Sequence, residues 1–253
     1  MLESYLKMKR KDKDILLMTH IVLGYPSFDD CFSLVKTMVD AGVDVMELQI
    51  PFSEPIADGP VILHANHKAL QAGVSVDACF KFAGMLTRTF DIPFLFMSYY
   101  NILFKYGMER FLSGMADHQI HGAIIPDLPP EEGEACLKGM TSMQMNPILI
   151  FSPTTSLQRM NYLSQFARGF IYCVARKGVT GQDTSFNHDL TAYLQQCRKA
   201  TALPLAVGFG VKEKGDIDFL KNKADIAVIG TQTLNILETE DIDAVGRFIR
   251  HLQ

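Results

Sequence analysis

The segment Val45–Ile50 carries one carboxylate and one amide in a run that is otherwise apolar. Side chains alternate across a β-strand, so Glu47 and Gln49 share one face and the apolar residues between them share the other. The apolar face is expected to pack on helices, which leaves Glu47 and Gln49 pointing into the interior of the fold. A buried carboxylate is costly unless it is paired or protonated. The pattern predicts a general acid/base at Glu47; the alternative is a Glu that only satisfies a structural hydrogen bond.

A second carboxylate, Asp58, follows in a loop over Pro51–Pro60 that contains three prolines. A long, stiffened loop directly after a strand is a candidate for function, although a decorative insertion is the alternative. Asp58 precedes a glycine and Asp127 lies between two prolines in Pro126–Pro129, so either residue could equally be a turn aspartate.

Glycine-containing turns follow three successive predicted strands, at Gly178–Gly181, Gly208–Gly210 and Ile229–Thr231. Free backbone N–H groups at such turns and at the helix N-termini beyond them bind anions. The sequence therefore predicts a phosphate site there, with plain turn chemistry as the alternative.

Other reactive groups do not assemble into a recognisable motif. The histidine pairs His64/His67 and His118/His121 lack the carboxylate-plus-histidine signature of a metal site, so no metal is expected. No lysine falls within a predicted strand, which leaves a Schiff-base aldolase without an obvious nucleophile. The five cysteines are scattered, with no Cys-x-x-Cys pair, so neither a disulfide framework nor a zinc ribbon is expected.

The elements that must position these residues alternate regularly along the chain. Eight short apolar segments, each followed by a longer amphipathic one, predict an α/β fold of the (β/α)₈ TIM-barrel type, with an extra helix at Leu2–Arg10. No linker or shift in composition divides the 253 residues, so residues 1–253 are expected to form a single domain. The predicted strands are Ile15–Val22, Val43–Gln49, Phe94–Tyr99, Gly122–Pro126, Pro147–Phe151, Gly169–Val174, Pro204–Val207 and Ala224–Ile229, and the predicted helices include Phe32–Ala41, Val76–Phe90, Met108–Asp117, Leu157–Phe166 and Asp189–Ala200.

The composition narrows the class of protein. A formal net charge of −4 argues against nucleic acid or an anionic membrane as the main partner. No run approaches the roughly 18 apolar residues of a membrane span, and no small-residue cleavage site follows the first apolar run. A cytoplasmic protein with a small-molecule substrate is expected.

The segment Glu47–Pro60 resembles the signature of tryptophan synthase α subunits, which runs E-L-G-[VI]-P-[FY]-S-D-P-x-A-D-G-P. The similarity extends over nearly the whole chain. It includes the segments Met97–Asn101, Asp127–Pro129, Arg176–Gly181, Gly208–Gly210 and Gly230–Thr231.

The resemblance implies a metal-free retro-aldol cleavage of indole-3-glycerol phosphate. Glu47 would handle the proton at C3 of the indole and the proton of the glycerol hydroxyl, and Asp58 would hold the indole N–H. Tyr172 would lie near Glu47 and the substrate, and Thr180 would close onto Asp58. The substrate cavity would be lined by Phe209, and the phosphate would be bound by Gly181, Gly210, Gly230 and Thr231.

The resemblance also implies a partner. A β subunit carrying pyridoxal phosphate would receive the indole through a tunnel in an αββα heterotetramer, while this chain would need no cofactor. Glu54, Pro55 and Asn101 match family positions at that interface.

Several residues depart from the family pattern. Gln49 stands in place of a glycine, His20 in place of an aromatic residue against the indole, Thr19 in place of a proline, Ala175 in place of a serine and Glu54 in place of an aspartate. Gln49 and His20 are expected to reduce the volume and the apolar contact of the pocket, which would lower kcat/KM by roughly a hundred- to a thousandfold. The alternative to an active lyase is thus a chain that keeps fold and interface and acts as an allosteric activator. Another phosphate-binding barrel isomerase or aldolase is the remote alternative.

Overall fold

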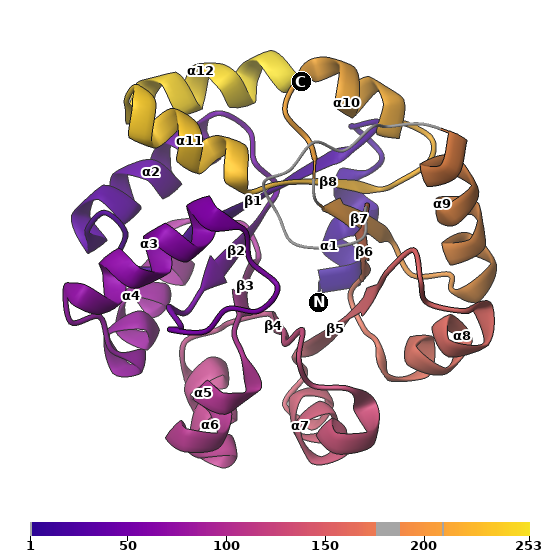
Figure 1. The fold of residues 1–253 in the computed structure, drawn as a ribbon, viewed down its shortest axis with the longest axis horizontal. Coiled ribbons are helices and arrows are strands. Elements are labelled where there is room, and N and C mark those ends of the chain that lie inside the picture. The colour runs from indigo at the N-terminus through magenta and orange to yellow at the C-terminus, as the bar shows by residue number, and fades with distance from the viewer. Residues whose placement is uncertain (1, 176–187, 209) are drawn as a thin grey trace.

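Eight parallel strands close into a barrel in the order of the chain, β1 to β8 (Figure 1). This closed barrel confirms the predicted (β/α)₈ fold. The computed structural model describes residues 2–175, 188–208 and 210–253. The strands are β1 (Leu16–Val22), β2 (Val45–Gln49), β3 (Phe94–Met97), β4 (Gly122–Ile124), β5 (Asn146–Phe151), β6 (Ile171–Val174), β7 (Leu205–Gly208) and β8 (Ile226–Ile229).

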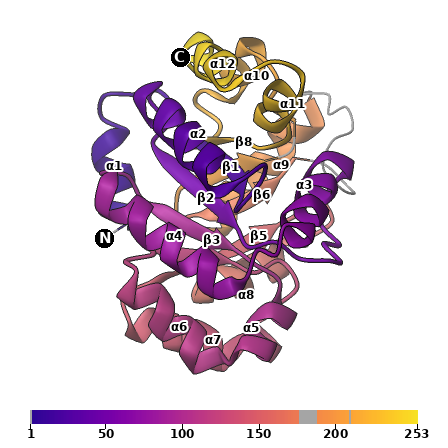
Figure 2. The ribbon, with the colours of Figure 1, turned by 90° about the vertical axis from the view of Figure 1, so that its left-hand side faces the viewer.

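Helices surround the barrel, and α2 and α4 lie across the outside of its first strands (Figure 2). Among the described helices, none combines the length and the apolar character needed to cross a membrane. The helices are α1 (Leu2–Lys9), α2 (Phe28–Asp40), α3 (Pro60–Gln71), α4 (Val76–Thr89), α5 (Tyr100–Tyr106), α6 (Met108–Asp117), α7 (Pro130–Ser142), α8 (Leu157–Phe166), α9 (His188–Ala200), α10 (Lys214–Leu220), α11 (Thr231–Thr239) and α12 (Ile242–Leu252).

The alternation of strand β2 places its residues in two different apolar clusters. Met46, Leu48 and Ile50 pack in the large cluster between the strands and the helices. Val45 belongs to the smaller cluster inside the barrel. Glu47 and Gln49 share the face of Val45, so their predicted inward direction is confirmed.

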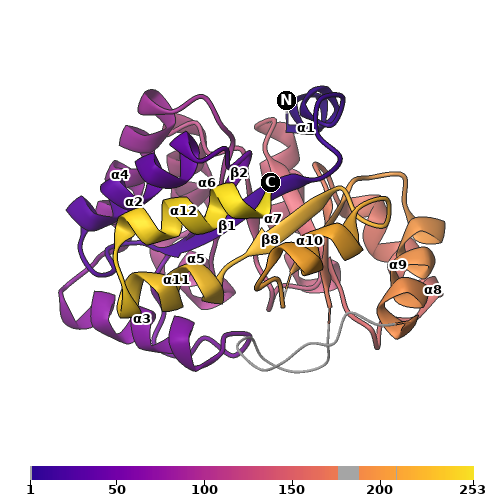
Figure 3. The ribbon, with the colours of Figure 1, turned by 90° about the horizontal axis from the view of Figure 1, so that it is seen from above.

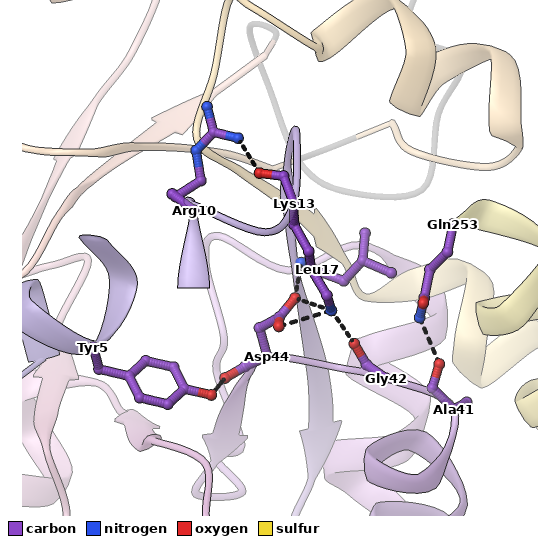
Figure 4. Close-up of polar contacts among 8 residues, drawn as sticks. All are labelled: Tyr5, Arg10, Lys13, Leu17, Ala41, Gly42, Asp44 and Gln253. Carbon is purple, nitrogen blue, oxygen red and sulfur yellow. Dashed lines mark hydrogen bonds and ion pairs between the residues drawn. The ribbon is translucent and has the colours of Figure 1, made fainter. Parts of the chain in front are cut away.

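Helix α1 closes the amino-terminal end of the barrel, as the extra predicted helix. Its buried residues Leu2 and Leu6 pack on the interior cluster, and Figure 3 shows α1 on the side of the barrel opposite to α3. Below it, the buried carboxylate of Asp44 accepts hydrogen bonds from Lys13 Nζ at 2.8 Å and from the Leu17 N–H at 2.9 Å (Figure 4). Tyr5 Oη donates to the Asp44 carbonyl at 3.0 Å, which ties α1 to the start of β2.

The long connection between β2 and β3 holds two helices, α3 and α4, where most units of the barrel hold one. Helix α3 begins at Pro60, directly after the proline-containing loop, with Gly59 as its N-cap. Proline suits the first helical position because its φ is already helical and its missing N–H would have no partner there. The loop is thereby held between the end of β2 and a fixed helix start, and this segment carries Asp58.

Candidate active site

Strands β1 and β2 bring the first two polar side chains together. The parallel register pairs His20 with Glu47 and Val22 with Gln49. Glu47 is 4% exposed and His20 is 5% exposed. His20 Nδ1 lies 3.2 Å from Glu47 Oε1, while Glu47 Oε2 has no hydrogen-bond partner among the described residues. One oxygen of the carboxyl group is therefore held by the imidazole, and the other is buried with its hydrogen-bonding capacity unused.

The charge of His20 is set by its acidic neighbours. Burial alone would lower the pKa of the imidazole, because it penalises the charged form. The carboxylate of Glu47, its hydrogen bond to the ring and the more distant Asp58 act in the opposite direction, and together they raise the pKa of His20 above its ordinary value. The imidazolium form of His20 is thus kept to higher pH than in a free histidine.

Asp58 reaches the same region from the loop after β2. Gln49 Nε2 donates to Asp58 Oδ2 at 2.6 Å. The hydroxyl of Tyr99 hydrogen-bonds to Asp58 and accepts from the Ala57 N–H at 3.1 Å. Burial raises the pKa of Asp58, and the hydrogen bond from Gln49 opposes that rise. These donors keep a loop carboxylate in one place beside the barrel.

Asn66, on helix α3, supports this arrangement and was missed by the sequence analysis. The side chain is fully buried. Its Oδ1 accepts from the Phe52 N–H at 2.9 Å and from Gln49 Nε2 at 3.4 Å, and its Nδ2 donates to the Ile62 carbonyl at 2.8 Å. The sequence offered no signal for it, because helix α3 was itself not predicted and the burial of the amide depends on that helix.

Tyr172, on β6, is buried in the interior cluster of the barrel, within electrostatic reach of Glu47 and Asp58. Burial, followed by the charges of Glu47 and Asp58, raises the pKa of Tyr172 well above its ordinary value. The phenol is therefore neutral and can donate a hydrogen bond. The ring occupies the space of a side chain at Gly208, where an added Cβ would lie 2.4 Å from the Tyr172 hydroxyl.

Two of the predicted glycine turns follow adjacent strands. Gly210 comes after β7 with φ +130°, and Gly230 is the N-cap of α11 after β8. Helix α11 begins at Thr231, and the first N–H groups of a helix have no partner within it. A Cβ at Gly230 would lie 3.5 Å from His20 Cβ, so the start of α11 borders the His20–Glu47 pair.

The other predicted site residues fall into two groups. Thr180, Gly181 and Phe209 lie outside the described residues. Glu54 and Asn101 are exposed, and Pro55 is buried.

Asp127 has a structural contact. It accepts a hydrogen bond from the Tyr100 N–H at 2.8 Å, at the start of α5. Within the described ranges, no three His, Cys, Asp or Glu side chains gather as a metal site.

The site built around Glu47 and Asp58 has the groups for proton transfer. Glu47 can give and take a proton, and Asp58 can stabilise a positive charge.

Comparison with known proteins gives one consistent result. The family model described as "Tryptophan synthase alpha chain" matches residues 6–250. The tryptophan synthase alpha chain of Desulforapulum autotrophicum is 60% identical over 252 residues, which cover 100% of each chain. That of Syntrophotalea carbinolica is 56% identical over 253 residues, again 100% of both chains.

A solved structure agrees with these sequences. The crystal structure of tryptophan synthase subunit alpha from Legionella pneumophila superposes with a TM-score of 0.90 at 29% identity. The match covers 99% of this chain and 96% of that one.

Proposed function

This chain belongs to the tryptophan synthase alpha chain family of lyases, and we propose from that premise that it cleaves indole-3-glycerol phosphate into indole and glyceraldehyde 3-phosphate. One observation carries the proposal. Glu47 is buried in the middle of β2 with one carboxyl oxygen held by His20 and the other without a hydrogen-bond partner among the described residues, and Asp58 is held nearby by Gln49.

The proposed retro-aldol reaction needs one group that both gives and takes a proton. The carboxyl group of Glu47 gives a proton to C3 of the indole ring, and Asp58 stabilises the positive charge that then resides on the ring N–H. The resulting carboxylate takes the proton of the hydroxyl on the adjacent carbon. The bond between that carbon and C3 breaks, its electron pair returns to the ring, and the hydroxyl carbon becomes the aldehyde.

The remaining roles are carried over from the resemblance. The phosphate would bind the backbone N–H groups of Gly210, Gly230 and Thr231 at the start of α11, together with Gly181, which lies outside the described residues. Tyr172 would contact the substrate near Glu47 as a neutral phenol. No cofactor of this chain enters the reaction.

The family implies a β-subunit partner, and we propose that this chain passes indole to it within an αββα heterotetramer in the cytoplasm. Pyridoxal phosphate would belong to that partner. Glu54 and Asn101 are exposed and Ile56 is 74% exposed, so the loop after β2 and the first turn of α5 offer charged, polar and apolar groups to a protein surface. Pro55 would stiffen the loop after β2.

A second candidate function is an allosteric activator of the β subunit with little lyase activity. The observation that favours it is the placement of His20 and Gln49, which are buried directly beside Glu47 and Asp58. Side chains in those places take volume that a bicyclic ring would need.

The release of glyceraldehyde 3-phosphate from indole-3-glycerol phosphate, measured with β subunit added, separates the two functions. We expect activity in the unaltered chain and a loss of about 10²–10⁴-fold in Glu47→Gln, because the amide cannot transfer the proton. Glu240→Gln, at an exposed position at the end of α11, is the matched control. No release from the unaltered chain, combined with faster conversion of added indole by the β subunit, would establish the activator instead.

A further inference from the structure

His20 and Gln49 each contact one of the two carboxylates assigned above. His20 Nδ1 meets Glu47 Oε1, and Gln49 Nε2 donates to Asp58 Oδ2. We propose that His20 and Gln49 are positioning residues for the lyase reaction: His20 holds the carboxyl group of Glu47 with Oε2 directed at the substrate, and Gln49 holds Asp58. This inference rests on the proposed function and goes beyond it, because it assigns a role to the two residues that depart from the family pattern.

The contact between His20 and Glu47 is set by the backbone of the barrel. The two residues are register partners on the adjacent strands β1 and β2, so neither can move along its strand without breaking the sheet. Gly230 lies beside His20, in ordinary van der Waals range of its side chain. A carboxylate accepts hydrogen bonds, so Nδ1 carries the proton that Glu47 Oε1 receives. The Oε2 atom is then left for the proton transfer.

The contact between Gln49 and Asp58 anchors a loop to a strand. The Gln49 amide nitrogen has two hydrogens: one points to Asp58, and the other faces Asn66 Oδ1 at 3.4 Å. Asn66 is itself fixed by the Ile62 carbonyl and the Phe52 N–H. A chain of hydrogen bonds therefore runs from helix α3 through Gln49 to Asp58, and Tyr99 holds the same carboxylate. Catalytic groups carried by loops need such support to keep a productive geometry.

Positioning and obstruction predict opposite signs for the same substitutions. If the two side chains only fill the pocket, then His20→Phe and Gln49→Gly raise the rate. If they position the carboxylates, both changes lower it. Gln49→Met separates the two effects, because methionine keeps about the volume of glutamine and cannot donate a hydrogen bond. His20→Asn makes the complementary test. The asparagine amide can donate a hydrogen bond from near the position of Nδ1, but it cannot carry a charge.

The test measures kcat and KM for indole-3-glycerol phosphate with the β subunit present. We expect His20→Phe and Gln49→Met to lower kcat by roughly ten- to a hundredfold with KM changed by less than about threefold, because the lost contacts act on groups that react. His20→Asn should recover most of that loss. His251→Asn and Gln195→Met, both at exposed positions on α12 and α9, are the matched controls and should leave kcat unchanged.

A second readout needs no activity. Glu47 and Asp58 are the acidic groups that raise the proton affinity of His20. In an NMR titration of the imidazole, Glu47→Gln should therefore move the titration of His20 to lower pH, and an unmoved titration would overturn the contact. An active protein whose kcat is unchanged or raised by His20→Phe and Gln49→Met would overturn the inference alone. An inactive unaltered protein would overturn the proposed function, and the inference with it.

Discussion

Gly208→Ala is the substitution whose effect on the site follows most directly from the distances in the structure. An added Cβ would lie 2.4 Å from the Tyr172 hydroxyl, 2.5 Å from Cε1 and 2.7 Å from Cζ of the same ring. Ordinary contact begins near 3.4 Å, so the ring must move by about 1 Å. Overpacking of this size costs about 1–3 kcal/mol of the free energy of unfolding. A displacement of about 1 Å in a pocket can also lower the rate roughly a hundredfold.

The assay compares kcat/KM for glyceraldehyde 3-phosphate release with the midpoint of urea unfolding in the same preparation. Gly215→Ala on α10 is the control, because its Cβ would meet only Glu213 Oε1 at 3.6 Å. That change should leave the activity unaltered and stabilise the helix slightly. Unchanged kcat/KM and unchanged stability in Gly208→Ala would refute the close packing of Tyr172 against β7.

Three further predictions follow from other parts of the structure. Asp44→Ala should lower the free energy of unfolding by about 2–3 kcal/mol without changing kcat. The substitution removes a buried acceptor of the Leu17 N–H and a partner of the half-exposed Lys13. Equal urea midpoints of the variant and the unaltered chain would contradict this. Thr231→Asp should raise KM for the phosphate substrate roughly tenfold or more, because it places a negative charge at the start of α11. The neutral Thr231→Asn is the control and should not raise KM. A similar KM in both variants would contradict the phosphate site. Glu54→Lys should weaken binding to the β subunit roughly tenfold at low salt and less at high salt, and a salt-independent affinity equal to that of the unaltered chain would remove Glu54 from the interface.

The barrel could be predicted because each of its strands is encoded locally. In β2, alternation alone separated the residues facing the helices from those facing the interior, and the two apolar clusters confirm this division. The ends of strands were less accurate. The fourth strand was predicted to reach Pro126 and stops at Ile124, and a proline has no N–H to donate to a neighbouring strand. Helix α3 was not predicted, since Pro60 reads equally well as a loop residue or as a first helical residue.

The candidate site could be predicted only in part, because its geometry depends on contacts between distant segments. The direction of Glu47 followed from strand alternation. The position of Asp58 did not, since a loop aspartate before glycine reads as a turn residue. Its place depends on Gln49, Tyr99 and, through Gln49, on Asn66 in the following helix. No local pattern connects these residues.

The same limit explains why the sequence suggested obstruction where the contacts support positioning. A pattern of residue types shows that Gln49 adds volume on the face of Glu47, and it does not show whether the amide meets a substrate or a protein group. Once Asp58 and Asn66 lie within 2.6 and 3.4 Å of its nitrogen, the hydrogen-bonding capacity of that nitrogen is used inside the protein. A polar side chain whose donors are satisfied in this way is oriented by the fold rather than by the ligand. The departure of Gln49 from the family pattern is therefore best understood together with its partners, and we expect its loss to release Asp58 and lower the rate.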